Sequence, residues 1–213
     1  MKFFIVLALL FSTSVRADEV KLSDLKVTWG GFVDTYFAYD FNSPSSRDRD
    51  YNTQAVRNNE FNINLAYFEA KIEGTRLRGR LALQAGTSVQ SNYAGEPTIG
   101  ANSGPQLSRY LQEAYAGYQL TDFWWLDAGV MLSHLGSESW ISRDNPTYLR
   151  SLVADYSPYY QTGIRNDFKV SDQVSAQLWI MNGWQNISEN NDSKSVGVQL
   201  KCQPSAQWTF TYN

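Results

Sequence analysis

The chain of 213 residues contains one cysteine, one histidine and one long apolar run. A single cysteine excludes a disulfide framework and a cysteine-rich zinc site. The apolar run lies at the N-terminus and is about half as long as a membrane-spanning helix must be, which excludes a helical membrane protein. The formal charge of −3, without a basic cluster, argues against nucleic acid as a partner.

The first residues have the pattern of an export signal. Lys2 supplies a positive charge, residues 3–11 form a short apolar core, and small or aliphatic residues lead to Ala17. We expect a signal peptidase to cut between Ala17 and Asp18. A retained anchor helix is disfavoured because the run is too short to span a membrane. The chain is thus expected to comprise a signal peptide (1–17), an N-terminal periplasmic segment (18–26) and a β-barrel domain (27–213).

Apolar residues recur at every second position, which is typical of strands with one face in an apolar medium. From residue 27 to residue 41 the odd positions are apolar and the even positions are mixed. The alternation changes phase near Ala66, which predicts a β-bulge. Nine strands are predicted in all, over residues 27–41, 60–72, 77–90, 112–120, 124–132, 159–170, 173–184, 194–202 and 206–213.

The predicted connections alternate between long and short. The long ones cover residues 42–58, 91–111, 133–158 and 185–193, whereas the others are tight turns such as Ser171-Asp172. Transmembrane barrels place long loops on the outer side and short turns on the periplasmic side. A soluble β-sandwich has no reason to gather its long loops at one end. The predicted fold class is therefore all-β, an antiparallel transmembrane β-barrel.

Barrel closure is the condition that such strands must meet. Lipid cannot satisfy backbone hydrogen-bonding groups, so strands span a membrane only in a barrel without free edges. Bacterial single-chain barrels have an even number of strands, and nine are predicted here. We therefore expect an incomplete barrel, the N-terminal part of a longer one. With the export signal, this predicts the outer membrane of a Gram-negative-type cell.

Six stretches of the chain resemble the OmpL-like β-barrel porin family, and the resemblance extends over nearly the whole part that follows the predicted signal. The NGWQ sequence is the most specific of their features. The resemblance implies an outer-membrane porin, a family whose chains continue beyond the end of this one. The stretches are Trp29–Asn42, Asn59–Ala66, Arg80–Tyr93, Leu111–Leu120, Ser133–Gly163 and Asn182–Ile187.

The charged residues on the mixed strand faces are the candidate site, since a porin selects solutes by the charge and width of a water-filled lumen. The alternative is that these side chains are solvated charges paired with one another. Asp127 and Asp167 share the same face as the candidates. The predicted pore-lining residues are Asp34, Tyr36, Arg78, Arg80, Glu113 and Arg165.

The third long loop is a second candidate site. In general porins of similar topology this loop folds inward and narrows the channel, and we adopt this as a hypothesis. Loop carboxylates opposite wall arginines would then create a transverse field; a loop packed outward is the alternative. The predicted constriction residues are Glu138, Arg143, Asp144, Arg150 and Asp155.

Catalysis is not expected. A hydrolase would need His134 beside a serine on the same strand face, but Ser133, Ser137 and Ser139 occupy odd positions and point the other way in an extended strand. No metal site and no cofactor are expected. The expected partners are small hydrophilic solutes or ions and outer-membrane lipid. The sequence leaves open whether the chain forms a homo-oligomer.

Two other functions remain open at this stage. A non-conducting surface barrel would use its long loops to bind a partner, in a structural or adhesive role, and conductance separates it from a porin. A soluble secreted β-protein would bury its apolar strand faces against each other, and it would stay in solution without detergent.

Overall fold

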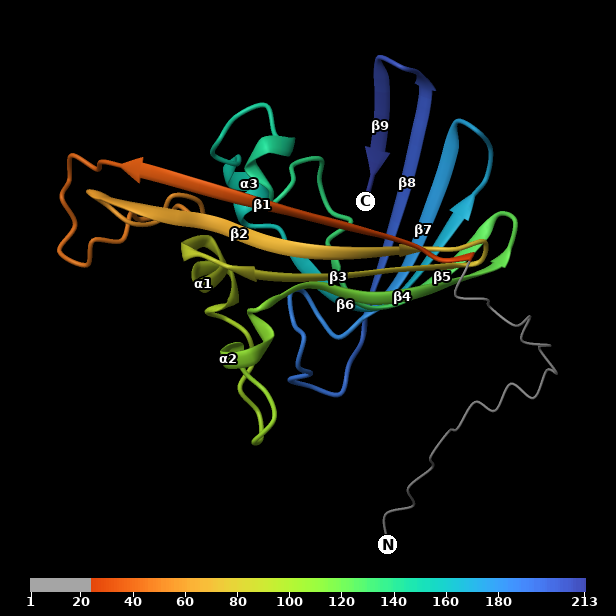
Figure 1. The fold of residues 1–213 in the computed structure, drawn as a ribbon, viewed down its shortest axis with the longest axis horizontal. Helices are drawn as coiled ribbons and strands as arrows, with labels where there is room; N and C mark the ends of the chain where they lie inside the picture. Colours follow the sequence, from red (N-terminus) through yellow and green to blue (C-terminus); the bar gives the residue numbers. More distant parts are fainter. Residues whose placement is uncertain (1–23) are drawn as a thin grey trace, which may run out of the picture.

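Nine antiparallel strands form a single curved sheet in the computed structural model, which describes residues 24–213 (Figure 1). Each strand pairs with the next one along the chain. The predicted all-β antiparallel fold is confirmed. The strands are β1 (Lys26–Ala38), β2 (Glu60–Glu73), β3 (Leu77–Ala85), β4 (Leu111–Thr121), β5 (Trp124–Leu132), β6 (Tyr160–Lys169), β7 (Val174–Met181), β8 (Ser195–Ser205) and β9 (Trp208–Tyr212).

Most of the predictions for the N-terminus concern residues that the structure does not describe. The predicted signal peptide, with its cleavage site between Ala17 and Asp18, lies outside the described residues. So does most of the predicted periplasmic segment, 18–26. Its last residue, Lys26, already belongs to β1 and pairs with Glu73 of β2.

The sheet is open within residues 24–213. The strands run in order from β1 to β9, and these two strands are its edges. In Figure 1 the direction of the strands turns steadily from β1 to β9, so the sheet curls around one of its faces. A curled, open, antiparallel sheet is what an incomplete β-barrel presents. No helix in the described part of the chain is long and apolar enough to span a membrane.

The two faces of the sheet differ in polarity. The outer, convex face carries large apolar side chains in contact with solvent, such as Trp29 (64% exposed) and Val33 (66% exposed) on β1. The inner, concave face carries buried polar side chains, including Asp34, Glu69 and Asp127. This is the reverse of a soluble β-protein, in which the apolar face is the buried one.

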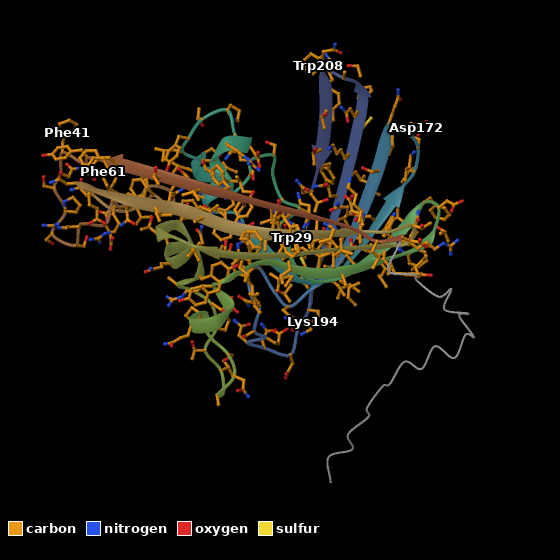
Figure 2. The ribbon with its side chains drawn as sticks, in the orientation of Figure 1. Trp29, Phe41, Phe61, Asp172, Lys194 and Trp208 are labelled. Carbon is orange, nitrogen blue, oxygen red and sulfur yellow. The ribbon has the colours of Figure 1, made fainter. Side chains whose placement is uncertain are left out.

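Long and short connections lie at opposite ends of the strands. Figure 2 shows Asp172 and Trp208 at the tips of short turns, which we call the turn end, and Lys194 at the opposite end, which we call the loop end. Four loops emerge at the loop end: the first (39–59), second (86–110), third (133–159) and fourth (182–194). The helices lie in these loops: α1 (Thr87–Tyr93), α2 (Pro105–Ser108), the 3₁₀ helix η2 (Ser142–Asp144) and α3 (Leu152–Asp155).

The third predicted strand, residues 77–90, is wrong in its last part. β3 ends at Ala85, and the chain then turns at Gly86, whose φ of +142° is rarely adopted by other residues, into helix α1. Val89 and Tyr93, four residues apart, are buried on the same side of α1. The alternation of Thr87 and Val89 fits a strand, but it is too short to exclude a helix.

The predicted bulge is present two residues from the expected position. Asp34 of β1 pairs with Leu65, but the next residue, Thr35, pairs with Ile63, so Asn64 is the extra residue on β2. Because the bulge shifts the pleat by one position, Asn64 and Leu65 are both fully buried.

A hydrophobic core fills the loop end of the inner face. It joins Leu65 of β2 to Val89 and Tyr93 of α1 and to Trp140 of the third loop. The rings of Tyr93 and Tyr160 stack with centroids 4.2 Å apart. The core therefore holds α1 and the third loop against the wall.

Candidate functional site

A lattice of ion pairs runs across the inner face, and we call it the wall lattice. It contains the arginines Arg78, Arg80 and Arg165 and the carboxylates Glu69, Glu113, Asp127 and Asp167. Each arginine contacts two of these carboxylates. Its residues come from five strands, β2 to β6. Alternation had placed all of them except Glu69 on the same face.

Among the ion pairs of residues 24–213, the wall lattice has two groups, Arg80 with Glu69 and Glu113, and Arg78 and Arg165 with Asp127 and Asp167. Asp127 is fully buried and is shared by both arginines of the second group. Arg78 Nε donates to its Oδ1 at 2.7 Å, and Arg165 Nη2 donates to its Oδ2 at 2.7 Å. Both arginines also contact Asp167, Arg165 through Nε at 3.1 Å. Two arginines thus satisfy this buried carboxylate, and such charge-assisted hydrogen bonds are the strong ones.

A glycine allows the lattice to cross a strand. Arg78 lies on β3 and Asp127 on β5, so their contact passes over β4 at Gly117, which pairs with both residues. A Cβ atom at Gly117 would collide with the Asp127 carboxylate and lie 3.1 Å from Cγ of Arg78. The absence of a side chain at Gly117 therefore makes room for the ion pair.

Aromatic rings support the arginines of the wall lattice. The guanidinium of Arg78 lies 4.5 Å from the ring centroid of Trp125, and that of Arg165 lies between Tyr115 and Trp179 at 5.6 and 5.4 Å. Cation–π contacts and paired carboxylates fix the positions of these side chains. The arginines are therefore neutralised locally, and the wall is a strip of alternating charge rather than a basic patch.

The structure brings four of the predicted pore-lining residues into the wall lattice: Arg78, Arg80, Glu113 and Arg165. Their role in a pore stays a prediction. Glu69 was not among the predicted residues, although it lies on the inner face and pairs with Arg80 at 2.6 Å and Lys71 at 3.3 Å. The signal that could have revealed it is the run Glu69, Lys71, Glu73, which places three charges on one side of β2.

The other two predicted residues, Asp34 and Tyr36, lie at the loop end of β1 and contact loops. Asp34 accepts hydrogen bonds from Asn64 Nδ2 at 2.8 Å, Ser142 Oγ at 2.9 Å and the Tyr148 hydroxyl at 3.1 Å. Burial and the charge of Asp34 raise the pKa of Tyr148, which therefore remains a donor. Asp34 thus anchors the third loop to the wall.

Asn64, the residue of the bulge, joins the first and second loops at the same place. Its Oδ1 accepts from the backbone N–H of Ala55 at 3.0 Å, and its Nδ2 contacts Gln54 as well as Asp34. Its backbone carbonyl accepts from Ser88 Oγ of α1 at 2.8 Å. Asp34 and Asn64 form what we call the loop anchor, which connects β1, β2 and three loops.

One predicted constriction residue, Arg143, contacts the inner wall. Arg143 Nη2 donates to the hydroxyl of Tyr67 at 3.2 Å, and its guanidinium lies 5.1 Å from the ring centroid of Phe32. Asp144 pairs with Arg143 at 3.4 Å. The third loop therefore lies along the inner faces of β1 and β2, which carry Phe32 and Tyr67.

The remaining constriction residues contact loop groups. Glu138 accepts from the N–H and hydroxyl of Ser151, and these bonds lower its pKa. Asp155 accepts from Thr53 Oγ1 at 2.7 Å. Arg150 lies 3.9 Å from the ring centroid of Tyr159. The wall arginines pair with wall carboxylates, so a transverse field between loop and wall stays a prediction.

His134, the second residue of the third loop, contacts Gln161 of β6 and Trp179 of β7. Its Nδ1 lies 2.7 Å from Oε1 of Gln161, and its ring stacks on Trp179 with centroids 5.1 Å apart. Gly197 leaves space for the ring, since a Cβ there would lie 2.6 Å from His134 Cε1. In residues 24–213 no group of three or more histidine, cysteine, aspartate or glutamate side chains could hold a metal ion.

A curled antiparallel sheet with an apolar outer face, a charged inner face and long loops at one end has the architecture of a membrane β-barrel wall. Residues 26–213 match the family described as "Putative beta-barrel porin-2, OmpL-like", and the chain belongs to this family. The family description points to a non-enzymatic channel and implies an outer-membrane location. Comparison with curated proteins gives no match.

Proposed function

We propose that the chain forms part of the wall of an outer-membrane channel through which small hydrophilic solutes or ions diffuse passively. The observation that carries this proposal is the contrast between the two faces of the sheet. Apolar side chains on the outer face suit lipid, and the wall lattice on the inner face suits water. Export by the predicted signal peptide belongs to the same proposal.

The third loop supports a channel with a constriction. The loop anchor and the contacts of Arg143 hold it on the inner side of the wall, where it would narrow a lumen. Asp144 is among the exposed side chains of this loop. Solutes would then pass between the third loop on one side and the wall lattice on the other.

Planar-bilayer conductance tests the channel. We would compare the 213-residue chain with any longer product of the same reading frame, since the open sheet edges must be paired before a barrel can conduct. Discrete, stable steps from either product support a channel. If a folded, membrane-inserted product gives no steps, the chain is better explained as a non-conducting surface barrel. The exposed loop side chains Phe41, Tyr51 and Tyr156 would then be candidates for partner binding.

Ion selectivity tests the constriction in the conducting product. Replacing Asp144 and Asp155 by asparagine removes two negative charges from the third loop, so the reversal potential should shift toward anion selectivity. Arg165→Gln on the wall should shift it in the opposite direction. Unchanged reversal potentials in the loop variant would show that the third loop does not line the pore.

A further inference from the structure

The third loop encloses a small pocket of its own, with a volume of about 240 Å³. The pocket lies between the end of β5 and the segment before β6, and Glu138, Trp140, Arg150 and Tyr159 are among its lining residues. Pockets for drug-sized ligands begin at about 300 Å³. This one therefore suits a smaller molecule, since it has room for about eight waters at ~30 Å³ each.

Arg150 is the distinctive group of this pocket. Its side chain is only 9% exposed, and its guanidinium lies 3.9 Å from the ring centroid of Tyr159. Nη2 donates to the carbonyl of Ala154 at 2.9 Å, but Nε is buried without a hydrogen-bond partner. The protein therefore does not pair all of the donors of this guanidinium, and an anion in the pocket would pair with its charge.

Glu138 supplies the opposite charge. Its two oxygens accept from the N–H and hydroxyl of Ser151, which lies next to Arg150 in the chain. In the described part of the chain no direct ion pair joins Glu138 to Arg150. The pocket therefore presents a guanidinium and a carboxylate that do not neutralise each other by contact.

We propose that this pocket binds a small zwitterion, with its carboxylate on Arg150 and its cationic nitrogen facing Glu138, as in a free amino acid. Trp140 and Tyr159 give apolar contact to the rest of such a molecule. The inference deepens the proposed function, on which it rests, because the pocket belongs to the loop that would narrow the channel. Small zwitterions would then be a class of solute that binds in the third loop.

Saturation-transfer NMR on the folded chain in detergent micelles tests the pocket with three related probes. L-alanine carries both charges, propionate lacks the amine and ethylammonium lacks the carboxylate. We expect L-alanine to bind more tightly than propionate, and propionate more tightly than ethylammonium. Wild-type protein that binds none of the probes, or binds L-alanine no better than propionate, would overturn the proposal.

Matched variants assign the two charges. Arg150→Gln should weaken L-alanine and propionate binding by at least about tenfold, and Arg150→Lys, which keeps the charge, should lose less. Glu138→Gln should weaken L-alanine binding, which loses the partner of its amine, and should not weaken propionate binding, since a repelling carboxylate is removed. Arg109→Gln in the second loop is the control and should bind like wild type. Wild-type affinity in both Arg150 variants would contradict the proposal.

The experiments distinguish failure of the pocket proposal from failure of the channel proposal. Binding in micelles needs no conductance. L-alanine binding together with no conductance from the folded, membrane-inserted longer product would support the pocket and contradict the channel. A conducting chain that binds no probe would contradict the pocket alone. Near-UV circular dichroism of each variant shows whether the third loop keeps its tertiary contacts.

Discussion

At the residue scale, Asp34 links a strand to two loop side chains through one buried carboxylate. Asn64, Ser142 and Tyr148 all donate to it. The amide of an asparagine at this position offers one acceptor oxygen and a nitrogen that cannot accept. Loss of one buried hydrogen-bond partner costs about 1–3 kcal/mol. Asp34→Asn hardly changes the size of the side chain, but it should release the third loop because it removes such a partner.

We therefore expect Asp34→Asn to lower the free energy of unfolding by about 1–3 kcal/mol and to speed protease cleavage within residues 133–159. Urea unfolding in micelles and limited proteolysis measure the two effects. Asp172→Asn is the control, since Asp172 is an exposed turn residue paired only with Lys169 in the ion pairs of the described chain. Equal behaviour of the two variants would show that Asp34 does not anchor the loop.

Gly117 is the second position where one residue determines a contact between elements. A methyl group there would collide with Asp127 and crowd Arg78, so Gly117→Ala should lower the free energy of unfolding by about 1–3 kcal/mol, as overpacking usually does. A Cβ atom at Gly95 would meet no other heavy atom within 4 Å, and Gly95→Ala should leave stability nearly unchanged. The urea midpoint reports both. An unaffected Gly117→Ala variant would mean that the ion pair does not need to cross β4.

At the element scale, helix α1 covers the part of the loop end that strands β3 and β4 are too short to reach. β3 ends at Ala85 and β4 begins at Leu111, while β2 extends further toward the loop end. Tyr93 at the end of α1 is fully buried, stacks on Tyr160 and donates to the carbonyl of Leu111 at 2.6 Å. The helix thus connects β4 to β6 at the height where β3 has stopped.

Tyr93→Ala should remove this connection and cost about 3–5 kcal/mol, the range for a large buried aromatic side chain. Tyr110→Ala offers a matched control in the same loop because its side chain is 43% exposed. Thermal unfolding in micelles compares the variants. A similar loss in both would indicate that α1 is not part of the packed wall.

The strands and their faces could be predicted from the sequence, but the contacts between them could not. Side chains alternate between the two faces of a strand, so the alternating pattern predicts the face on which Arg78, Glu113 and Arg165 lie. The pairing of Arg78 with Asp127 depends on the register of three strands and on Gly117, which no local pattern encodes. Helix α1 was missed because its apolar spacing over residues 87–90 also fits a strand.

The loop anchor shows the same limit. The phase change near Ala66 predicted a bulge, and the structure has one at Asn64. Its role in holding three loops depends on Gln54, Ala55 and Ser88, which are close only in the folded chain. The position of the third loop came from family resemblance rather than from any pattern in residues 133–159.

At the scale of the whole molecule, the number of strands, odd or even, determines whether the sheet can close into an antiparallel barrel. Strands in an antiparallel sheet alternate in direction, so β1 and β9 run the same way and cannot form an antiparallel pair with each other. Closure by antiparallel pairs alone needs an odd number of further strands between them, which gives the even total typical of bacterial barrels. Until these edges are paired, they expose backbone groups that lipid cannot satisfy.

The outer face provides the most direct test that this sheet lies in lipid. Leu178 and Gln177 are neighbours on β7, but Leu178 lies on the apolar outer face and Gln177 faces inward, opposite Asp167 of β6. An arginine on the lipid side of a barrel near its midplane costs about 2–4 kcal/mol, whereas an arginine in a lumen is solvated. Leu178→Arg should therefore weaken folding into lipid vesicles by about 2–4 kcal/mol. Gln177→Arg should weaken it less, because its charge faces the wall lattice and it loses only the hydrogen bond that Gln177 Oε1 accepts from Trp179 Nε1 at 2.9 Å. Folding yield and urea unfolding in vesicles measure the difference. If the two variants fold equally well, and the chain stays in solution without detergent, the outer face does not meet lipid and the sheet belongs to a soluble protein.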